Sequence, residues 1–281
     1  MKCFFEVCAD AAKHATETKS FGSHYSDVNN QNHEMHMHDC CEIFLCLSGG
    51  NSFLIDNKVY DIKNGDLFII NHFEAHQVVP DKNAVFERYI MLVHPTFLYT
   101  NSHGDADLCS CFYSENKTAR ITPAPKDTAY LISLFEALRG ERQYGDELYK
   151  KLKCTELLLE VSRLFAAYGS TAAEGVSHKT VQLAIDYING YYSSPLSLES
   201  VAKNAFVSPN QLSRLFKKYC GTTVAKYIIS KRITEAKKLL SEGKSVTDTA
   251  FICGFNDYAN FIKAFKKAVG VPPGKYRKEQ N

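Results

Sequence analysis

Hydrophobic residues in the first third of the chain fall in short runs separated by turn residues. The runs are rich in β-branched and aromatic residues, and Gly, Asn and Asp stand between them. Short runs at such regular spacing are typical of an antiparallel sandwich or a small barrel. The pattern predicts strands over residues 42–47, 52–55, 59–62, 67–70 and 85–93.

The hydrophobic period changes after Asp127. Apolar residues then recur at the three- and four-residue spacing of a helix, over residues 129–140 and 148–169. These apolar faces need a partner, either the chain's own strands or a second copy of the chain, and the pattern leaves both open. The candidate dimer surface consists of Leu131, Leu134, Phe135 and Leu138.

Residues 169–179 are small and polar and have no hydrophobic period, which suits a linker. A chain of 281 residues also exceeds the ~100–200 residues usual for one domain. We therefore expect a domain over residues 1–170 with helices at about 127–168, a linker over 171–179, and an all-helical domain over 180–281.

Composition adds a charge asymmetry to this division. Hydrophobic residues make up 45% of the chain and charged residues 23%, as in ordinary globular proteins. From Lys179 onward there are 17 Lys and Arg against 7 Asp and Glu, whereas the preceding residues hold 16 and 24. A compact basic domain typically binds nucleic acid, although charge alone would equally suit an anionic membrane.

Two further observations concern the compartment. No apolar run approaches the ~20 residues needed to cross a bilayer, so we expect no membrane segment. The ten cysteines are scattered along the chain, which favours reduced thiols and a cytoplasmic protein over a disulfide framework.

The basic half contains an internal repeat. Leu212, Phe216, Gly221 and Tyr227 are matched 49 residues later by Phe261, Phe265, Gly270 and Tyr276, and the pair Lys217 and Lys218 by Lys266 and Lys267. Two copies of one helical unit are therefore expected. The expected core includes Phe206, Phe216, Phe255, Phe261 and Phe265, and Gly254 is expected in a tight turn.

One helix of the first copy has a polar face. Ser208 and Pro209 are typical N-cap and first helical residues, so the helix begins at Pro209. Its exposed face is predicted to carry Asn210, Ser213, Arg214 and Lys217, with Lys218 beside them. Asn and Arg can pair with adenine and guanine in a major groove while Lys meets phosphate. A solvated face is the alternative for one copy, but two copies favour DNA.

A long helix is expected over residues 223–243, between the two units. About 18 helical residues span ~27 Å. That length approaches the ~34 Å between successive major grooves on one side of DNA. Both polar helices of one chain could therefore read adjacent half-sites.

Residues 181–278 resemble the double helix-turn-helix domain of the AraC family of bacterial transcription regulators. The resemblance rests on QLSRLFKKYCGTTVAKYIISKRITEAKKLL and TAFICGFNDYANFIKAFKKAVGVPPGKYR. It implies a regulator that binds promoter or operator DNA, responds to a small-molecule effector and often forms a homodimer. Position by position, the resemblance implies that six residues lie at or near DNA: Asn210, Ser213, Arg214, Tyr258, Asn260 and Lys263. The internal repeat adds Lys266 and Lys267.

The second unit departs from the family pattern. Lys263 replaces the usual Arg, Asn260 a frequent aromatic residue, and Thr249 an apolar one. If the second unit is aligned strictly with the first, the exposed face of its helix instead carries Ala259, Ile262, Lys263 and Lys266. We therefore expect the second helix mainly to contact the DNA backbone and thymine methyl groups.

The first half contains a histidine-rich motif. His36, His38 and Glu42 form an H-x-H-x-x-x-E pattern, and a later strand could bring in His76. Three imidazoles and a carboxylate suit a divalent transition metal. The arrangement resembles the two motifs of metal-binding cupins, although Asn71 and Phe73 stand where that pattern has Pro and Gly.

In regulators that resemble AraC, a cupin-like domain with similar residues commonly binds an organic effector without a metal. We therefore predict an α+β chain: a cupin-like β-barrel with flanking helices, followed by the helical DNA-binding domain. His36, His38, Glu42 and His76 are expected to hydrogen-bond a polar effector, with a carbohydrate among the candidates.

No catalytic residue, metal or cofactor is expected, and the alternative is a metal-dependent cupin enzyme fused to a DNA-binding domain. Four aromatic residues could line the effector pocket or simply form the core: Phe44, Phe53, Tyr60 and Phe68.

Overall fold

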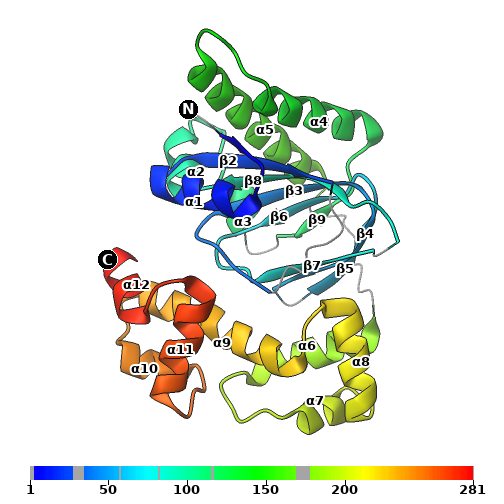
Figure 1. Ribbon diagram of the computed structural model, residues 1–281, viewed down its shortest axis with the longest axis vertical. Coiled ribbons are helices and arrows are strands. Elements are labelled where there is room, and N and C mark those ends of the chain that lie inside the picture. The colour runs from blue at the N-terminus through cyan, green and yellow to red at the C-terminus, as the bar shows by residue number, and fades with distance from the viewer. Residues whose placement is uncertain are drawn as a thin grey trace.

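The computed structural model describes residues 3–27, 35–56, 58–81, 83–114, 117–168 and 178–280, without the side chains of 279 and 280. Two β-sheets with covering helices form one half, and helices alone form the other (Figure 1). This division confirms the α+β fold class. Within the described ranges, no helix is both long enough and apolar enough to cross a membrane.

The larger sheet has the strand order β1-β2-β8-β3-β6-β9. The pairing of β1 with β2 is parallel and the other pairings are antiparallel. The strands are β1 (Phe4–Phe5), β2 (Phe21–Ser26), β3 (Cys41–Ser48), β6 (Leu67–Ile70), β8 (Glu87–Val93) and β9 (Arg120–Ile121).

The smaller sheet has the order β5-β4-β7. Its strands are β4 (Gly50–Ile55), β5 (Lys58–Asp61) and β7 (His76–Pro80). Aromatic residues of both sheets meet in one core, where the Phe53 ring lies 4.9 Å from that of Phe44 and 5.0 Å from that of Phe68. All three side chains are buried, as is Tyr60, so these residues form core. The described strands form two facing sheets rather than a closed barrel.

Among the described residues, five helices accompany the sheets. They are α1 (Cys8–Thr18), α2 (Pro95–Asn101), α3 (Ser110–Tyr113), α4 (Pro125–Arg139) and α5 (Asp146–Tyr168). The apolar face of α4 packs on the larger sheet, where the Phe135 ring stacks on Tyr89 with centroids 4.9 Å apart. Leu131, Leu134 and Leu138 are buried in the same core. Of the two partners left open for these four residues, the chain's own sheet is the one that covers them, so they are not available as a dimer surface.

The C-terminal half contains two helix-turn-helix units joined by a long helix. The helices are α6 (Lys179–Tyr191), α7 (Leu198–Asn204), α8 (Pro209–Cys220), α9 (Val224–Ser241), α10 (Val246–Ile252), α11 (Tyr258–Val269) and α12 (Pro273–Gln280). One core joins α6, α7, α8 and the start of α9, and a second joins the end of α9 to α10, α11 and α12. The predicted duplication is thus confirmed.

The two units differ at one turn residue. Gly254, in the second unit, has a φ of 80°, as expected for a tight turn. Phe206 occupies the same position in the first unit, with a φ of 58° and 84% of its surface exposed. The expectation that Phe206 belongs to the core is wrong, because the left-handed turn directs this side chain to solvent. Phe216, Phe255, Phe261 and Phe265 are buried as expected.

Opposite effects are expected from changing these two turn residues. Phe206→Gly should stabilise the chain by about 0.5–1 kcal/mol, because relief of the left-handed strain exceeds the entropy that glycine adds to the unfolded state. Gly254→Ala should destabilise it by more than about 1 kcal/mol, since a Cβ atom would lie 2.5 Å from the Ser193 carbonyl oxygen. Urea unfolding of the full chain measures both, and effects of equal sign would contradict the explanation.

The expected linker over 171–179 lies outside the described residues except at its end. His178 is described, and Lys179 already forms the first residue of α6. All ten cysteines carry free thiols.

Candidate DNA-reading helices and effector site

The turn signals at Ser208 and Pro209 set the start of α8. The Ser208 side chain accepts a hydrogen bond from the backbone N–H of Gln211 at 3.2 Å, and Pro209 needs no intrahelical partner for its nitrogen. Leu212 and Phe216 are buried against the rest of the unit. The opposite face of the helix is therefore held toward solvent.

The predicted contact residues of α8 are all exposed: Asn210, Ser213, Arg214, Lys217 and Lys218. Two of them also have partners within the chain. The Lys217 ammonium donates to the Gly221 carbonyl at 2.8 Å, and the Lys218 ammonium lies 4.8 Å from the centroid of the Tyr219 ring. Asn210 and Arg214 belong to the N-terminal part of the helix, so amide and guanidinium groups gather there.

Helix α11 repeats this design with different chemistry. The carboxylate of Asp257 accepts the backbone N–H of Asn260 at 3.1 Å and caps the helix, while Phe261 and Phe265 are buried. The predicted contact residues are again exposed: Tyr258, Asn260, Lys263, Lys266 and Lys267. In the alternative alignment, Ala259 is exposed and Ile262 is half-buried. The exposed face of α11 is therefore mainly cationic.

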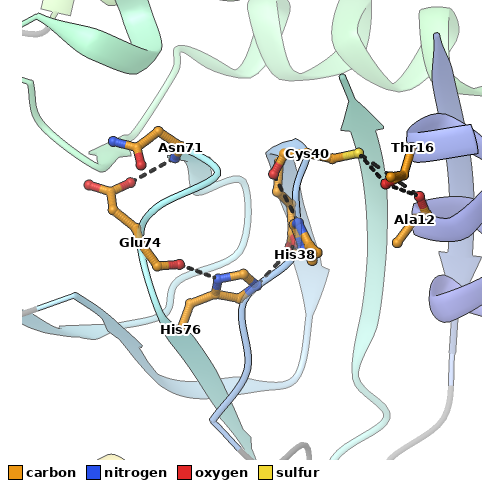
Figure 2. Close-up of polar contacts among 8 residues, drawn as sticks. Ala12, Thr16, His38, Cys40, Asn71, Glu74 and His76 are labelled. Carbon is orange, nitrogen blue, oxygen red and sulfur yellow. Dashed lines mark hydrogen bonds and ion pairs between the residues drawn. The ribbon is translucent and has the colours of Figure 1, made fainter. Parts of the chain in front are cut away.

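The predicted effector residues come together at one end of the two sheets. His36 forms a two-way backbone bridge with His76, with N···O distances of 3.1 and 2.9 Å. The ring centroid of His76 lies 4.4 Å from that of His36 and 5.1 Å from that of His38. Glu42, on β3, has its Oε2 atom 2.9 Å from His38 Nε2 and 3.3 Å from His76 Nε2. Figure 2 shows His38 and His76 pointing toward one another.

The Glu42 carboxylate and the neighbouring imidazoles stabilise each other's charged forms. Burial alone would favour a neutral Glu42, but the adjacent imidazoles of His76 and His38 outweigh it and hold the pKa of Glu42 well below its usual value. Burial would likewise lower the pKa of His76, but the Glu42 carboxylate outweighs it and raises that pKa. The cluster therefore favours a carboxylate anion surrounded by groups that can carry positive charge.

Contacts between the two halves were not predicted from the sequence. The Tyr227 hydroxyl donates to the Asp56 carbonyl at 2.7 Å, and the Ser52 hydroxyl donates to the Tyr219 carbonyl at 2.8 Å. Leu54 of the smaller sheet belongs to the same core as the first helix-turn-helix unit. The C-terminal end of α8 thus packs on the sheet domain, while its N-terminal end carries Asn210 and Arg214.

A buried ion pair adds to this interface. The ammonium of Lys237 on α9 lies 3.0 Å from a carboxylate oxygen of Asp39, two residues before the start of β3. The Lys237 side chain is 1% exposed and that of Asp39 is 37% exposed. This ion pair therefore connects the segment that contributes His36 and His38 to α9, the helix that joins the two helix-turn-helix units.

Family descriptions match both halves of the chain. An AraC-like ligand binding domain matches residues 22–160, and a helix-turn-helix domain matches residues 201–279. Relatives extend the match over most of the chain. The HTH-type transcriptional regulator YdeC of Bacillus subtilis is 25% identical over 251 residues, covering 87% of this chain and 86% of the relative.

Two further relatives match different extents of the chain. The HTH-type transcriptional activator RhaR of Pectobacterium carotovorum is 24% identical over 254 residues, covering 86% of this chain and 85% of the relative. The multiple antibiotic resistance protein MarA of Escherichia coli is 36% identical over 99 residues, covering 35% of this chain and 78% of the relative.

Proposed function

The chain belongs to the AraC family of transcription regulators, and we propose that it reads one promoter or operator with both α8 and α11. The observation that carries this proposal is the pair of exposed polar helices, each backed by its own core and joined by the 18-residue α9. A rigid α9 of ~27 Å suits two successive major grooves. Each chain would thereby contact two half-sites about one helical turn apart.

The two helices have different roles in this proposal. On α8, Asn210 and Arg214 read base edges, Ser213 assists them, and Lys217 and Lys218 contact phosphate. On α11, Lys263, Lys266 and Lys267 bind phosphate, with Tyr258 and Asn260 beside them at the N-terminal end. The first unit would therefore supply most of the sequence preference and the second much of the affinity.

The N-terminal half acts as the sensor. His36, His38, Glu42 and His76 form the polar part of an effector site, and a carbohydrate hydroxyl is one group they could hydrogen-bond. The effector would change the contacts between the halves and so the DNA sites that can be occupied. The relatives named above are regulators, so we propose no enzymatic step, and a bacterial regulator of this kind works in the cytoplasm.

The function can be tested by selecting bound sequences from random duplex DNA with the full chain. The expected result is an enriched motif with two parts, bound in the presence of excess nonspecific competitor. If selection enriches no motif and binding follows salt concentration alone, the chain is not a sequence-specific regulator.

Dimerisation through the exposed face of α5 is a further part of the proposal. Leu148, Leu152 and Leu159 lie on one face of this helix and are 63%, 59% and 44% exposed. A second copy would bury this apolar surface. Leu152→Glu is therefore expected to convert a dimer to a monomer, as measured by analytical ultracentrifugation. Lys151→Glu, exposed on the same helix, is the matched control, and a parent chain that is already monomeric would contradict this surface.

A further inference from the structure

The histidine cluster has a donor arrangement that could hold a metal cation. One ring nitrogen from each of His36, His38 and His76 lies within 4.8 Å of the other two. His36 is exposed at the edge of the cluster, whereas His76 is 2% exposed and Glu42 is 3% exposed. The site is thus closed on one side and open to solvent on the other.

Backbone carbonyls fix which nitrogen of the His38 and His76 rings faces the centre. The Nδ1 atom of His38 donates to the Cys40 carbonyl at 2.9 Å, and the Nδ1 atom of His76 donates to the Glu74 carbonyl at 3.0 Å (Figure 2). A carbonyl oxygen only accepts, so Nδ1 carries the hydrogen in both rings. In the neutral rings, both Nε2 lone pairs then face the cluster.

The lone pairs of both rings converge on a third acceptor. The Nε2 atoms of His38 and His76 lie 2.9 and 3.3 Å from the same carboxylate oxygen of Glu42, and His76 Nε2 has no partner with hydrogen-bond geometry. Two nitrogen acceptors and a carboxylate repel one another unless positive charge lies between them. Either two protons or one divalent cation would supply that charge.

Three converging imidazoles favour the cation. The ring of His36 lies beside that of His76, and one nitrogen from each of the three rings lies within 4.8 Å of the others. Three imidazoles with one carboxylate form the donor set of first-row transition metals, and carbonyls bonded to Nδ1 are the usual outer partners of such ligands.

We propose that His36, His38 and His76 bind one divalent transition-metal ion together with Glu42, and that this ion is the effector sensed by the chain. The proposal rests on the proposed function and names the ligand class of its sensor site. It departs from the expectation drawn from the sequence, which had these residues bind an organic effector, because spacing alone could not show the fixed Nδ1 hydrogens.

The same segment provides a route from the ion to the DNA-binding half. Residues alternate along it: His36 and His38 face the cluster, whereas Met35 packs on the core of the first helix-turn-helix unit and Met37 on that of the second. Asp39 continues the alternation with its ion pair to Lys237.

An ion held ~2.1 Å from each nitrogen in a tetrahedral site would bring the nitrogens to ~3.4 Å of one another. Because the nitrogens are up to 4.8 Å apart, we expect the rings, and with them the segment that carries His36 and His38, to shift on binding. That shift moves Met35, Met37 and Asp39 against both reading units, which links occupancy of the site to DNA affinity.

The test uses the full chain without an affinity tag, stripped with a chelator and titrated calorimetrically with Zn²⁺ and with Ni²⁺. We expect one ion per chain, and at least about ten-fold weaker binding for His36→Ala, which should fold because His36 is exposed. His103→Ala is the matched control, since His103 is exposed in the same half and should leave binding unchanged. Co²⁺ should give a visible absorption band that His36→Ala alters. The proposal is overturned if no ion binds, or if both variants bind like the parent chain.

DNA affinity provides the second measurement. Zn²⁺ is expected to change the affinity of the full chain for its selected DNA by about 5- to 150-fold, and His38→Ala should abolish the change. If the chain binds its selected DNA with the same affinity with and without Zn²⁺, the proposal that the metal is the effector is overturned and the proposed function still holds. Absence of specific DNA binding, with or without metal, would instead refute the proposed function.

Discussion

Arg214→Ala is expected to weaken binding to the selected DNA by about 1–3 kcal/mol, roughly 5- to 150-fold. The guanidinium is exposed on α8, beside the exposed amide of Asn210 one turn earlier. A bidentate contact to one guanine would be lost, so the preference for that base pair should relax while the other base preferences persist. Fluorescence anisotropy on a panel of single-base variants of the site measures both effects.

Lys266→Ala on α11 is the matched comparison for Arg214→Ala. Its ammonium is exposed and is assigned to phosphate, so its loss should weaken binding to all sequences alike and reduce the salt slope by about 1. The reverse outcome would contradict the assignment: an unchanged base preference for Arg214→Ala together with a relaxed one for Lys266→Ala.

Asp39→Asn is expected to lower the free energy of unfolding by about 2–3 kcal/mol. The ammonium of Lys237 is almost fully buried, and the substitution removes the carboxylate 3.0 Å away. An unpaired buried charge costs more than the pair contributes, and the partial exposure of Asp39 reduces the effect below the ~3–5 kcal/mol usual for a fully buried pair. Urea unfolding of the full chain, followed by circular dichroism, measures the change.

The double variant Asp39→Asn with Lys237→Met should recover most of the lost stability, because it removes both members of the pair. Asp105→Asn, a change of the same type at an exposed position, should have almost no effect. An ion pair without structural importance would leave Asp39→Asn as stable as Asp105→Asn.

Elements with a strong local pattern could be predicted from the sequence. The five predicted strands correspond to β3, β4, β5, β6 and β8, and the predicted helices to α4 and α5. The strands β3, β6 and β8 are buried on both faces and therefore appear in the sequence as short apolar runs between turn residues. The helix α4 is buried on one face and therefore shows a helical period. In contrast, β7 was anticipated only as a later strand that could bring in His76. Its five residues, HQVVP, show little alternation, and its strand character comes from pairing Val78 with Phe53 of β4.

Some hydrophobic positions had two physical explanations that the pattern could not separate. Leu131 and Phe135 would be apolar whether a second chain or the chain's own sheet covered them. Only the folded structure shows that the sheet covers them. Phe206 is hydrophobic, but the turn requires a positive φ at this position, which overrides the burial expected for its side chain.

The sequence predicted which residues belong to the candidate sites, but not how their side chains contact one another. The spacing of His36, His38 and Glu42, with His76, named the cluster, and the repeat named the two reading helices. The Nδ1 contacts to Cys40 and Glu74, and the ion pair of Lys237 with Asp39, join elements through folded geometry. No local pattern encodes them.

The central claim is that α8 and α11 of one chain read two neighbouring half-sites from the same side of the duplex. Measuring affinity for the selected site with 5 base pairs inserted between its halves tests this most directly, because about half a helical turn rotates one half-site to the opposite face. The account predicts that the insertion reduces affinity to that of a single half-site. Unchanged affinity after the insertion would contradict it.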